Sequence, residues 1–187
     1  MKKWQSDMGF SLLETMMTMA IFGTVAAMAA FQIGSARPGF KGDGAMRTVM
    51  AQLNIARELA ITQRRTMRVL FTAADEVQIV RENFGGVLAT TVISTVPMEG
   101  GIHYGLTSGL PDTPDNFGNN AAVYFGAAAQ YRFTSEGTLV DQADSPISGS
   151  VFLTFPGQVR GARAVTVLGA TGRVRGYKWD GRSWKRV

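Results

Sequence analysis

Cysteine is absent from the 187 residues, and histidine occurs only once, as His103. The absence of cysteine excludes a disulfide framework, a Cys-ligated zinc site and a thiol nucleophile. A single histidine excludes a multi-His metal site and leaves one candidate base for a Ser-His-Asp triad. Charged residues are sparse at 18%, whereas 45% of the residues are hydrophobic, which is typical of a folded chain rather than a disordered one.

Motifs of common enzymes are missing too. The sequence has no Walker-type glycine loop with lysine, no Gly-x-Ser-x-Gly elbow, and no pair of carboxylates at a catalytic spacing. The side chains of one cluster offer oxygen ligands for calcium: Asp112, Asp115, Asn116, Asn119 and Asn120. Their spacing does not match an EF-hand loop and favours a polar turn. We therefore expect no catalytic residue, no metal site and no cofactor.

A long apolar segment occurs near the start of the chain. No charged side chain lies from Thr15 to Ala36, a length of 22 residues that is sufficient for a helix to span a bilayer. Lys2 and Lys3 precede the segment, so the N-terminus should stay in the cytoplasm while the rest of the chain crosses the membrane. A signal anchor or a cleaved signal peptide shares this pattern. Glu14 argues against both, because a carboxylate in an apolar segment is costly without a partner.

The heptapeptide Met8–Glu14 (MGFSLLE) is similar to the processing signal of type IV pilins and pseudopilins. The resemblance implies that a prepilin peptidase cleaves after Gly9 and methylates the new N-terminal Phe10. It also implies an assembly role for Glu14, whose carboxylate would neutralise the N-terminal amine of a neighbouring subunit in the membrane. The expected partners are the peptidase, other pilin or pseudopilin subunits and the inner membrane, with a single span and the head outside.

Glycines and a proline follow the apolar segment, at Gly34, Pro38, Gly39, Gly42 and Gly44. Because proline and glycine disfavour the interior of a helix, we expect the first helix to kink or break here. Apolar residues then recur at three- and four-residue steps from Ala45 to Gln63. This period predicts an amphipathic helix that packs on a sheet.

After Arg65 the hydrophobic period changes to two, which is typical of strands. We expect strands at residues 66–72, 77–81, 87–96, 130–134, 151–155, 164–168, 173–179 and 182–187, with a turn at 84–86 and a long loop at 100–126. Asp180-Gly181 between the last two strands is a strong hairpin signal. The sequence thus predicts an α+β fold in four regions: a leader at 1–9, the transmembrane part of a helix at 10–36, a linker and amphipathic helix at 37–65, and an antiparallel β-rich head at 66–187.

Four further segments resemble the GspH/FimT group of minor pseudopilins. Residues 53–61 (LNIARELAI) are similar to the helix of that group, and residues 131–137 (YRFTSEG), 164–167 and 172–174 are similar to its later strands. The resemblance implies a type IV pilin-like fold, with a long N-terminal helix packed on an antiparallel sheet. The paired C-terminal cysteines of major pilins are absent, which favours a minor subunit.

Basic residues are concentrated at the C-terminal end. Residues 160–187 contain eight Lys and Arg and one Asp, a net charge of +7, whereas the other 159 residues sum to −2. The segment Gly172–Arg175 resembles the Gly-Arg-x-Arg motif of FimT-type pilins involved in DNA uptake during natural transformation, which implies DNA contacts by Arg173 and Arg175. A wider electropositive surface for phosphates would include Lys178, Arg182, Lys185 and Arg186.

Alternatives remain open for this tail. Trp179 and Trp184 would either stack on bases or pack within the hairpin. Gly-Arg-Val also occurs in relatives that serve type II secretion, where the arginine is structural and the basic tail would face other subunits or solvent. The leading hypothesis is therefore a non-enzymatic minor pilin-like subunit that binds DNA without sequence preference. The alternatives are a minor pseudopilin of a type II secretion system and a membrane-anchored enzyme or binding module outside any filament.

Overall fold

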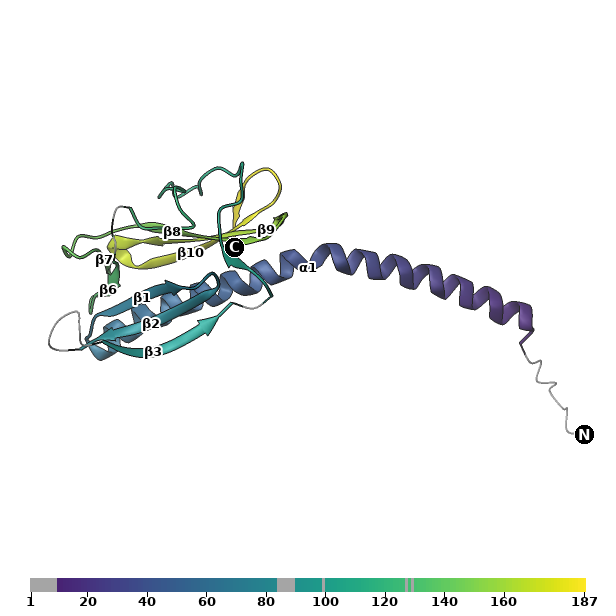
Figure 1. Cartoon of the computed structure of the whole chain (residues 1–187), viewed down its shortest axis with the longest axis horizontal. Coiled ribbons are helices and arrows are strands. Elements are labelled where there is room, and N and C mark those ends of the chain that lie inside the picture. Colours follow the sequence, from purple (N-terminus) through teal and green to yellow (C-terminus); the bar gives the residue numbers. More distant parts are fainter. Residues whose placement is uncertain (1–9, 84–89, 99, 127, 129) are drawn as a thin grey trace, which may run out of the picture. The chain divides into compact units, whose positions relative to one another are not determined.

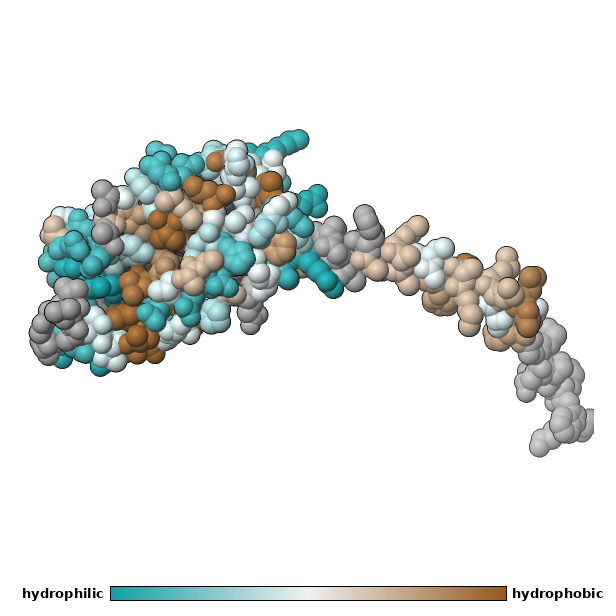
Figure 2. Space-filling view, viewed as in Figure 1, coloured by the Kyte–Doolittle hydropathy of each residue, from teal (hydrophilic) through white to brown (hydrophobic). Residues whose placement is uncertain are grey.

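The computed structural model describes residues 10–83, 90–98, 100–126, 128 and 130–187 (Figure 1). The chain divides into one unit that ends at Arg37 and a second unit, the head, from Pro38 to Val187. Helix α1 (Leu12–Gln63) contributes to both units. Its first part, Leu12–Ala30, is the one helical stretch of the described chain that is long and apolar enough to cross a membrane. All side chains of this stretch are exposed, and Figure 2 shows them as a mostly tan and brown surface.

The expected break between Gly34 and Gly44 is wrong, because α1 continues through Pro38. A proline inside a helix removes one main-chain donor, but tertiary packing supplies most of the stability of a helix in a protein and can offset this loss. Pro38 is buried in the head. A Cβ at Gly42 would lie 2.7 Å from the carbonyl oxygen of Gly161, so only glycine permits this close approach between helix and sheet.

The head contains two antiparallel sheets. The first has the order β3-β2-β1-β6-β7 and consists of β1 (Met67–Thr72), β2 (Glu76–Glu82), β3 (Thr90–Pro97), β6 (Arg132–Phe133) and β7 (Leu139–Val140). The second has the order β11-β10-β9-β8-β4 and consists of β4 (His103–Tyr104), β8 (Gly149–Phe155), β9 (Gln158–Leu168), β10 (Arg173–Trp179) and β11 (Trp184–Arg186). Strand β5 (Val123–Tyr124) pairs with β8, and the short helix η1 (Gly169–Thr171) joins β9 to β10.

The predicted α+β fold, with a long N-terminal helix and antiparallel sheets, is confirmed. The last two predicted strands match β10 and β11, and the strand predicted at 130–134 is reduced to the two residues of β6. The long loop at 100–126 is present but contains the two-residue strands β4 and β5. The turn predicted at 84–86 and the start of the strand predicted at 87–96 fall outside the described residues.

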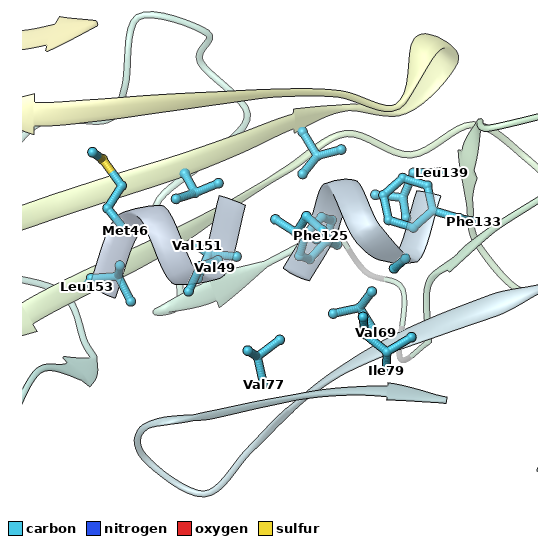
Figure 3. Packing of buried hydrophobic residues seen from close by; sticks show 14 of the residues in the cluster. Met46, Val49, Val69, Val77, Ile79, Phe125, Phe133, Leu139, Val151 and Leu153 are labelled. Atoms are coloured by element: carbon cyan, nitrogen blue, oxygen red, sulfur yellow. The ribbon is translucent and has the colours of Figure 1, made fainter. Parts of the chain in front are cut away.

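The core of the head lies where α1 packs between the two sheets (Figure 3). Val49 and Leu53 of α1 are fully buried in one cluster with Val69 and Ile79 of the first sheet and Val151 of the second. Burial of each such side chain contributes about 1.5–3 kcal/mol, so this cluster accounts for much of the stability of the head. The apolar positions of the amphipathic pattern predicted from Ala45 onward lie on this buried face of the helix.

A smaller apolar cluster occupies the opposite face of the second sheet. Phe152, Ala164, Tyr177 and Trp184 form it, and Leu110 packs against it from the segment between β4 and β5. Because side chains alternate between the two faces of a strand, Phe152 points away from the helix while its neighbour Val151 points toward it. The second sheet is therefore covered on both faces, by α1 on one and by the loop near Leu110 on the other.

Candidate functional site

The predicted assembly residues lie at the start of α1. Gly9 falls outside the described residues, whereas Phe10 is described and 78% exposed. Glu14 is exposed in the first turn of the helix, where a carboxylate interacts favourably with the helix dipole. Ser11 Oγ accepts a hydrogen bond from the main-chain N–H of Leu13 at 3.3 Å, which stabilises the helix start. Phe10 and Glu14 are thus both exposed on this unit of the chain.

The basic tail forms the predicted hairpin from β10 and β11. Lys178 of β10 lies opposite Lys185 of β11 in the antiparallel register. Asp180 closes the turn, because its Oδ1 accepts the main-chain N–H groups of Ser183 and Arg182, both at 2.8 Å. These two bonds hold the pKa of the Asp180 carboxyl below its ordinary value. The turn therefore gives the basic side chains of the hairpin defined places along the edge of the sheet.

Arg175, a predicted DNA contact, is paired within the head. Its guanidinium group donates a hydrogen bond to Oδ1 of Asp115, and the two side chains are 25% and 9% exposed. Oδ2 of Asp115 accepts hydrogen bonds from Thr166 Oγ1 at 2.6 Å and from the Tyr177 hydroxyl at 2.9 Å. Asp115 lies in the loop and its three partners lie in β9 and β10, so this carboxylate fastens the loop to the sheet.

The protonation of Asp115 follows from these contacts. Burial raises the pKa of its carboxyl, but the hydrogen bonds from Thr166 and Tyr177 and the charge of Arg175 outweigh this effect. The pKa is consequently held below its ordinary value of 3.8. The carboxylate is therefore charged at neutral pH and remains a full partner for Arg175.

Arg163, another basic residue of the tail, is also used internally. Its side chain is 5% exposed, and its Nε donates to Oδ1 of Asp43 in α1 at 2.7 Å. Its Nη2 donates to the carbonyl oxygen of Gly39 at 2.9 Å, and Nη1 donates to the carbonyl oxygens of Arg160 and Ala162, each at 2.9 Å. Arg163 thus ties the first residues of the head helix to β9 and is not an exposed charge.

The exposed basic residues of the hairpin lie at opposite ends of β10. Arg173 is the first residue of the strand, whereas four exposed side chains lie toward its other end and on the following turn and strand: Lys178, Arg182, Lys185 and Arg186. A strand of seven residues is about 20 Å long, at about 3.3 Å per residue. Arg173 therefore lies about 20 Å along the strand from the other exposed basic side chains of the hairpin.

Trp184 is part of the packing of the hairpin. The side chain is buried against Phe152, and its Nε1 donates to the carbonyl oxygen of Pro111 at 2.8 Å. The ring of Trp179 meets it edge to face, with 5.4 Å between the ring centroids. Of the two roles open to these tryptophans, hairpin packing is the one that the structure shows for Trp184.

The remaining candidate residues are the possible calcium ligands of the long loop and His103. Oδ1 of Asp112 accepts the N–H of Thr113 at 2.6 Å and its Oδ2 accepts the N–H of Gly118 at 2.7 Å, as expected for a polar turn. Within the described residues, no group of three or more His, Asp or Glu side chains is placed to hold a metal ion. His103 lies half-buried in β4 beside Tyr104.

The partnerships of Asp115 and Asp43 were not predictable from local patterns, since each partner is more than 50 residues away.

No protein-family model matches the sequence, and no curated protein matches it either. A solved structure does match: the type IV minor pilin FimU of Pseudomonas aeruginosa, at 16% identity and a TM-score of 0.50, over 76% of this chain and 91% of FimU. The chain has a type IV pilin-like fold. This likeness confirms the expected fold, a long N-terminal helix packed on antiparallel strands.

Two further solved structures are similar to this pilin-like chain. A second crystal form of FimU matches at 18% identity and a TM-score of 0.47, over 72% of this chain and 90% of FimU. The minor pseudopilin EpsH from the type 2 secretion system of Vibrio cholerae matches at 16% identity and a TM-score of 0.47, over 76% of this chain and 99% of EpsH.

Proposed function

We propose that this chain is a minor pilin-like subunit that enters a pilus or pseudopilus through its N-terminal helix. The observation that carries the proposal is a single helix, α1, whose exposed apolar part Leu12–Ala30 continues into the core helix of a pilin-like head. An exposed apolar helix needs a bilayer or other helices around it. The membrane surrounds the helix before assembly, and the helices of other subunits surround it in the filament.

The processing of the chain is part of this proposal. A prepilin peptidase cleaves after Gly9, and the new N-terminal Phe10 is methylated. The carboxylate of Glu14 pairs with the N-terminal amine of a neighbouring subunit, because an unpaired charge in hydrocarbon is costly. Before assembly the subunit is held in the inner membrane, with its head on the outer side.

Mass spectrometry of the full chain expressed with a prepilin peptidase tests this processing. We expect a mature N-terminus at a methylated Phe10, and no cleavage in a Gly9→Val variant. Gly44→Ala is the matched control, since no atom lies within 4 Å of a Cβ at Gly44. We also expect Glu14→Ala to be cleaved normally but to be missing from sheared filaments, and Glu14→Asp to be incorporated. An intact Met1 in the presence of the peptidase would contradict the proposal.

The kind of filament divides two versions of this function. A pilus for natural transformation and a pseudopilus for type II secretion both fit the subunit role, and deletion phenotypes separate them. Loss of secreted enzymes with normal transformation would identify a pseudopilin, whereas the reverse would identify a pilin for DNA uptake. Catalysis forms no part of either version.

DNA capture by the basic tail stays a prediction. The resemblance of Gly172–Arg175 to the Gly-Arg-x-Arg motif supports it, and the exposed position of Arg173 is compatible with it. The ion pair between Arg175 and Asp115 and the burial of Trp184 favour structural roles for two of the residues that would touch DNA. Four exposed basic side chains of the hairpin beyond Tyr177 remain available to an anionic partner: Lys178, Arg182, Lys185 and Arg186.

A further inference from the structure

Six exposed basic side chains gather at one end of the second sheet, which we name the basic end: Lys41, Arg160, Lys178, Arg182, Lys185 and Arg186. The register places them together, because Lys178 lies opposite Lys185 on one side and Arg163 on the other. The β8–β9 turn and the β10–β11 turn therefore project from the same end of the sheet. Lys41 joins them from α1, with its Nζ 5.5 Å from the ring centroid of Phe155.

The basic end carries a net positive charge. Asp180 is the acidic residue of its hairpin, and its carboxylate accepts two main-chain bonds and lies 3.7 Å from Lys185 Nζ. Asp43 is also at this end but is already paired with the buried Arg163. Acidic side chains thus balance few of the six positive charges, and an anionic surface would be attracted.

This end is also where the head helix begins. Arg163 of β9 binds the carbonyl oxygen of Gly39 and the carboxylate of Asp43, so the start of the helix lies against the end of β9. Ala30, the last residue of the apolar stretch, precedes Pro38 by eight residues. Even a fully extended chain of eight residues reaches only about 28 Å, so the start of the head helix lies within about that distance of the end of the apolar stretch.

Exposed apolar side chains accompany the positive charges. Phe40 beside Lys41 is 73% exposed, and Val159 beside Arg160 is 46% exposed. Basic residues mixed with exposed aromatic and aliphatic groups are typical of surfaces that lie in the headgroup region of a membrane. A duplex DNA contact needs the charges but offers no apolar environment to Phe40 or Val159.

We propose that the basic end binds the anionic phospholipid headgroups of the membrane that holds the chain's own N-terminal helix. The proposal rests on the membrane anchoring that is part of the proposed function. Contact with headgroups would orient the head on the bilayer before assembly, and the subunit would exchange these contacts for contacts with other subunits when it enters a filament. Arg173, at the far end of β10, takes no part.

The test uses the full chain in nanodiscs of phosphatidylcholine, with or without phosphatidylglycerol. Because the chain has no cysteine, Ser183→Cys provides a single site for a fluorophore at the basic end, and Ser135→Cys provides a matched site in the turn that precedes Gly137, next to Gly172 at the far end of β10. Lipids with a nitroxide on the headgroup quench a fluorophore that lies near the membrane surface. We expect phosphatidylglycerol to increase quenching at residue 183 and not at residue 135, and added salt to reverse the increase.

Charge variants sharpen the test. Arg182→Gln with Lys185→Gln is expected to reduce the lipid-bound population at residue 183 about tenfold, since each basic residue near an anionic surface contributes appreciably to binding. Arg64→Gln with Arg173→Gln, a matched pair remote from the basic end, should leave the quenching unchanged. Equal effects of the two pairs would overturn the proposal, because general charge would then explain the result.

Three other outcomes also overturn it. If the chain stays in the nanodisc but the label at residue 183 is insensitive to phosphatidylglycerol, the lipid contact is wrong while the anchoring stands. If duplex DNA shields that label at physiological salt and anionic lipid does not quench it, the basic end faces DNA instead. Elution of the chain without nanodiscs would show that the anchoring itself fails, and the lipid proposal with it.

Discussion

Replacing Asp115 with Ala is expected to lower the free energy of unfolding of the head by about 3 kcal/mol. The buried hydroxyl groups of Thr166 and Tyr177 would lose their shared acceptor, and each unsatisfied buried polar group costs about 1–3 kcal/mol. The loop would also lose its attachment to β9 and β10. Urea unfolding of the full chain in detergent micelles, followed by tryptophan fluorescence, measures the change.

Asp115→Asn is the matched control for this substitution. The amide keeps an oxygen acceptor for Thr166 or Tyr177 but removes the charge that Arg175 requires, so its loss of stability should be smaller than that of Asp115→Ala. Proteolysis should cut the Asp115→Ala chain faster in the segment at 105–120 than the parent. An unchanged urea midpoint and unchanged proteolysis in Asp115→Ala would contradict the attachment role.

The lowered pKa of Asp115 predicts a loss of stability in acid. Because the pKa of its carboxyl is lower in the folded state than the ordinary value of 3.8, the folded state favours the charged form. The stabilisation is complete well above the ordinary pKa and is lost as the pH falls through the ordinary and then the lowered value. The parent should therefore lose more stability than Asp115→Asn when the pH falls from 6 to 3. Urea unfolding repeated at several pH values in this range measures the difference.

Replacing Asp43 with Ala is expected to cost about 3 kcal/mol, more than the removal of its partner. The change would leave the charge of Arg163 buried without a counter-ion, which is strongly unfavourable. Arg163→Met would remove that charge, fill similar volume and leave Asp43 in a site that is 38% exposed to water. We expect Arg163→Met to lose about 2 kcal/mol, because the partly exposed Asp43 stays hydrated but three main-chain carbonyl oxygens lose their donor.

A surface ion pair gives the matched control for Asp43. Asp144 pairs with Arg132 at 2.9 Å, but its side chain is 74% exposed, so Asp144→Asn, which tolerates the positive φ of 59° at this position, should cost less than about 1 kcal/mol. Urea unfolding of the three variants under identical conditions ranks them. A greater loss in Arg163→Met than in Asp43→Ala would show that the hydrogen bonds of Arg163 to main-chain carbonyls, rather than its charge, hold the helix to β9.

The fold was largely predictable because it depends on local patterns. The apolar stretch after Glu14, the three- and four-residue period from Ala45 to Gln63 and the Asp180-Gly181 turn each report on residues close in the chain. The predicted break near Pro38 was wrong because it depends on tertiary packing rather than on local pattern. Whether a proline and four glycines end a helix depends on what packs against them, and here β9 approaches Gly42 too closely for any side chain.

The candidate site was predictable in its charges but not in its pairings. Composition alone places eight positive charges in residues 160–187, and the alternation of β10 puts Arg173 and Arg175 on one face. Nothing local to the tail shows that Asp115 neutralises Arg175, that Asp43 neutralises Arg163, or that Pro111 accepts the indole N–H of Trp184. These partners are 60, 120 and 73 residues away.

The sequence alone therefore specifies a membrane-length apolar helix, a β-rich head and a strongly basic tail, since helix and strand periods and net charge are properties of neighbouring residues. Which of the basic side chains reach solvent is a property of the packed head. A basic side chain is exposed or buried according to which parts of the chain pack against it. Where it is buried, the cost of desolvation makes a nearby carboxylate necessary. Folding thus converts a tail of eight positive charges into two internal ion pairs, an exposed Arg173 and one basic end.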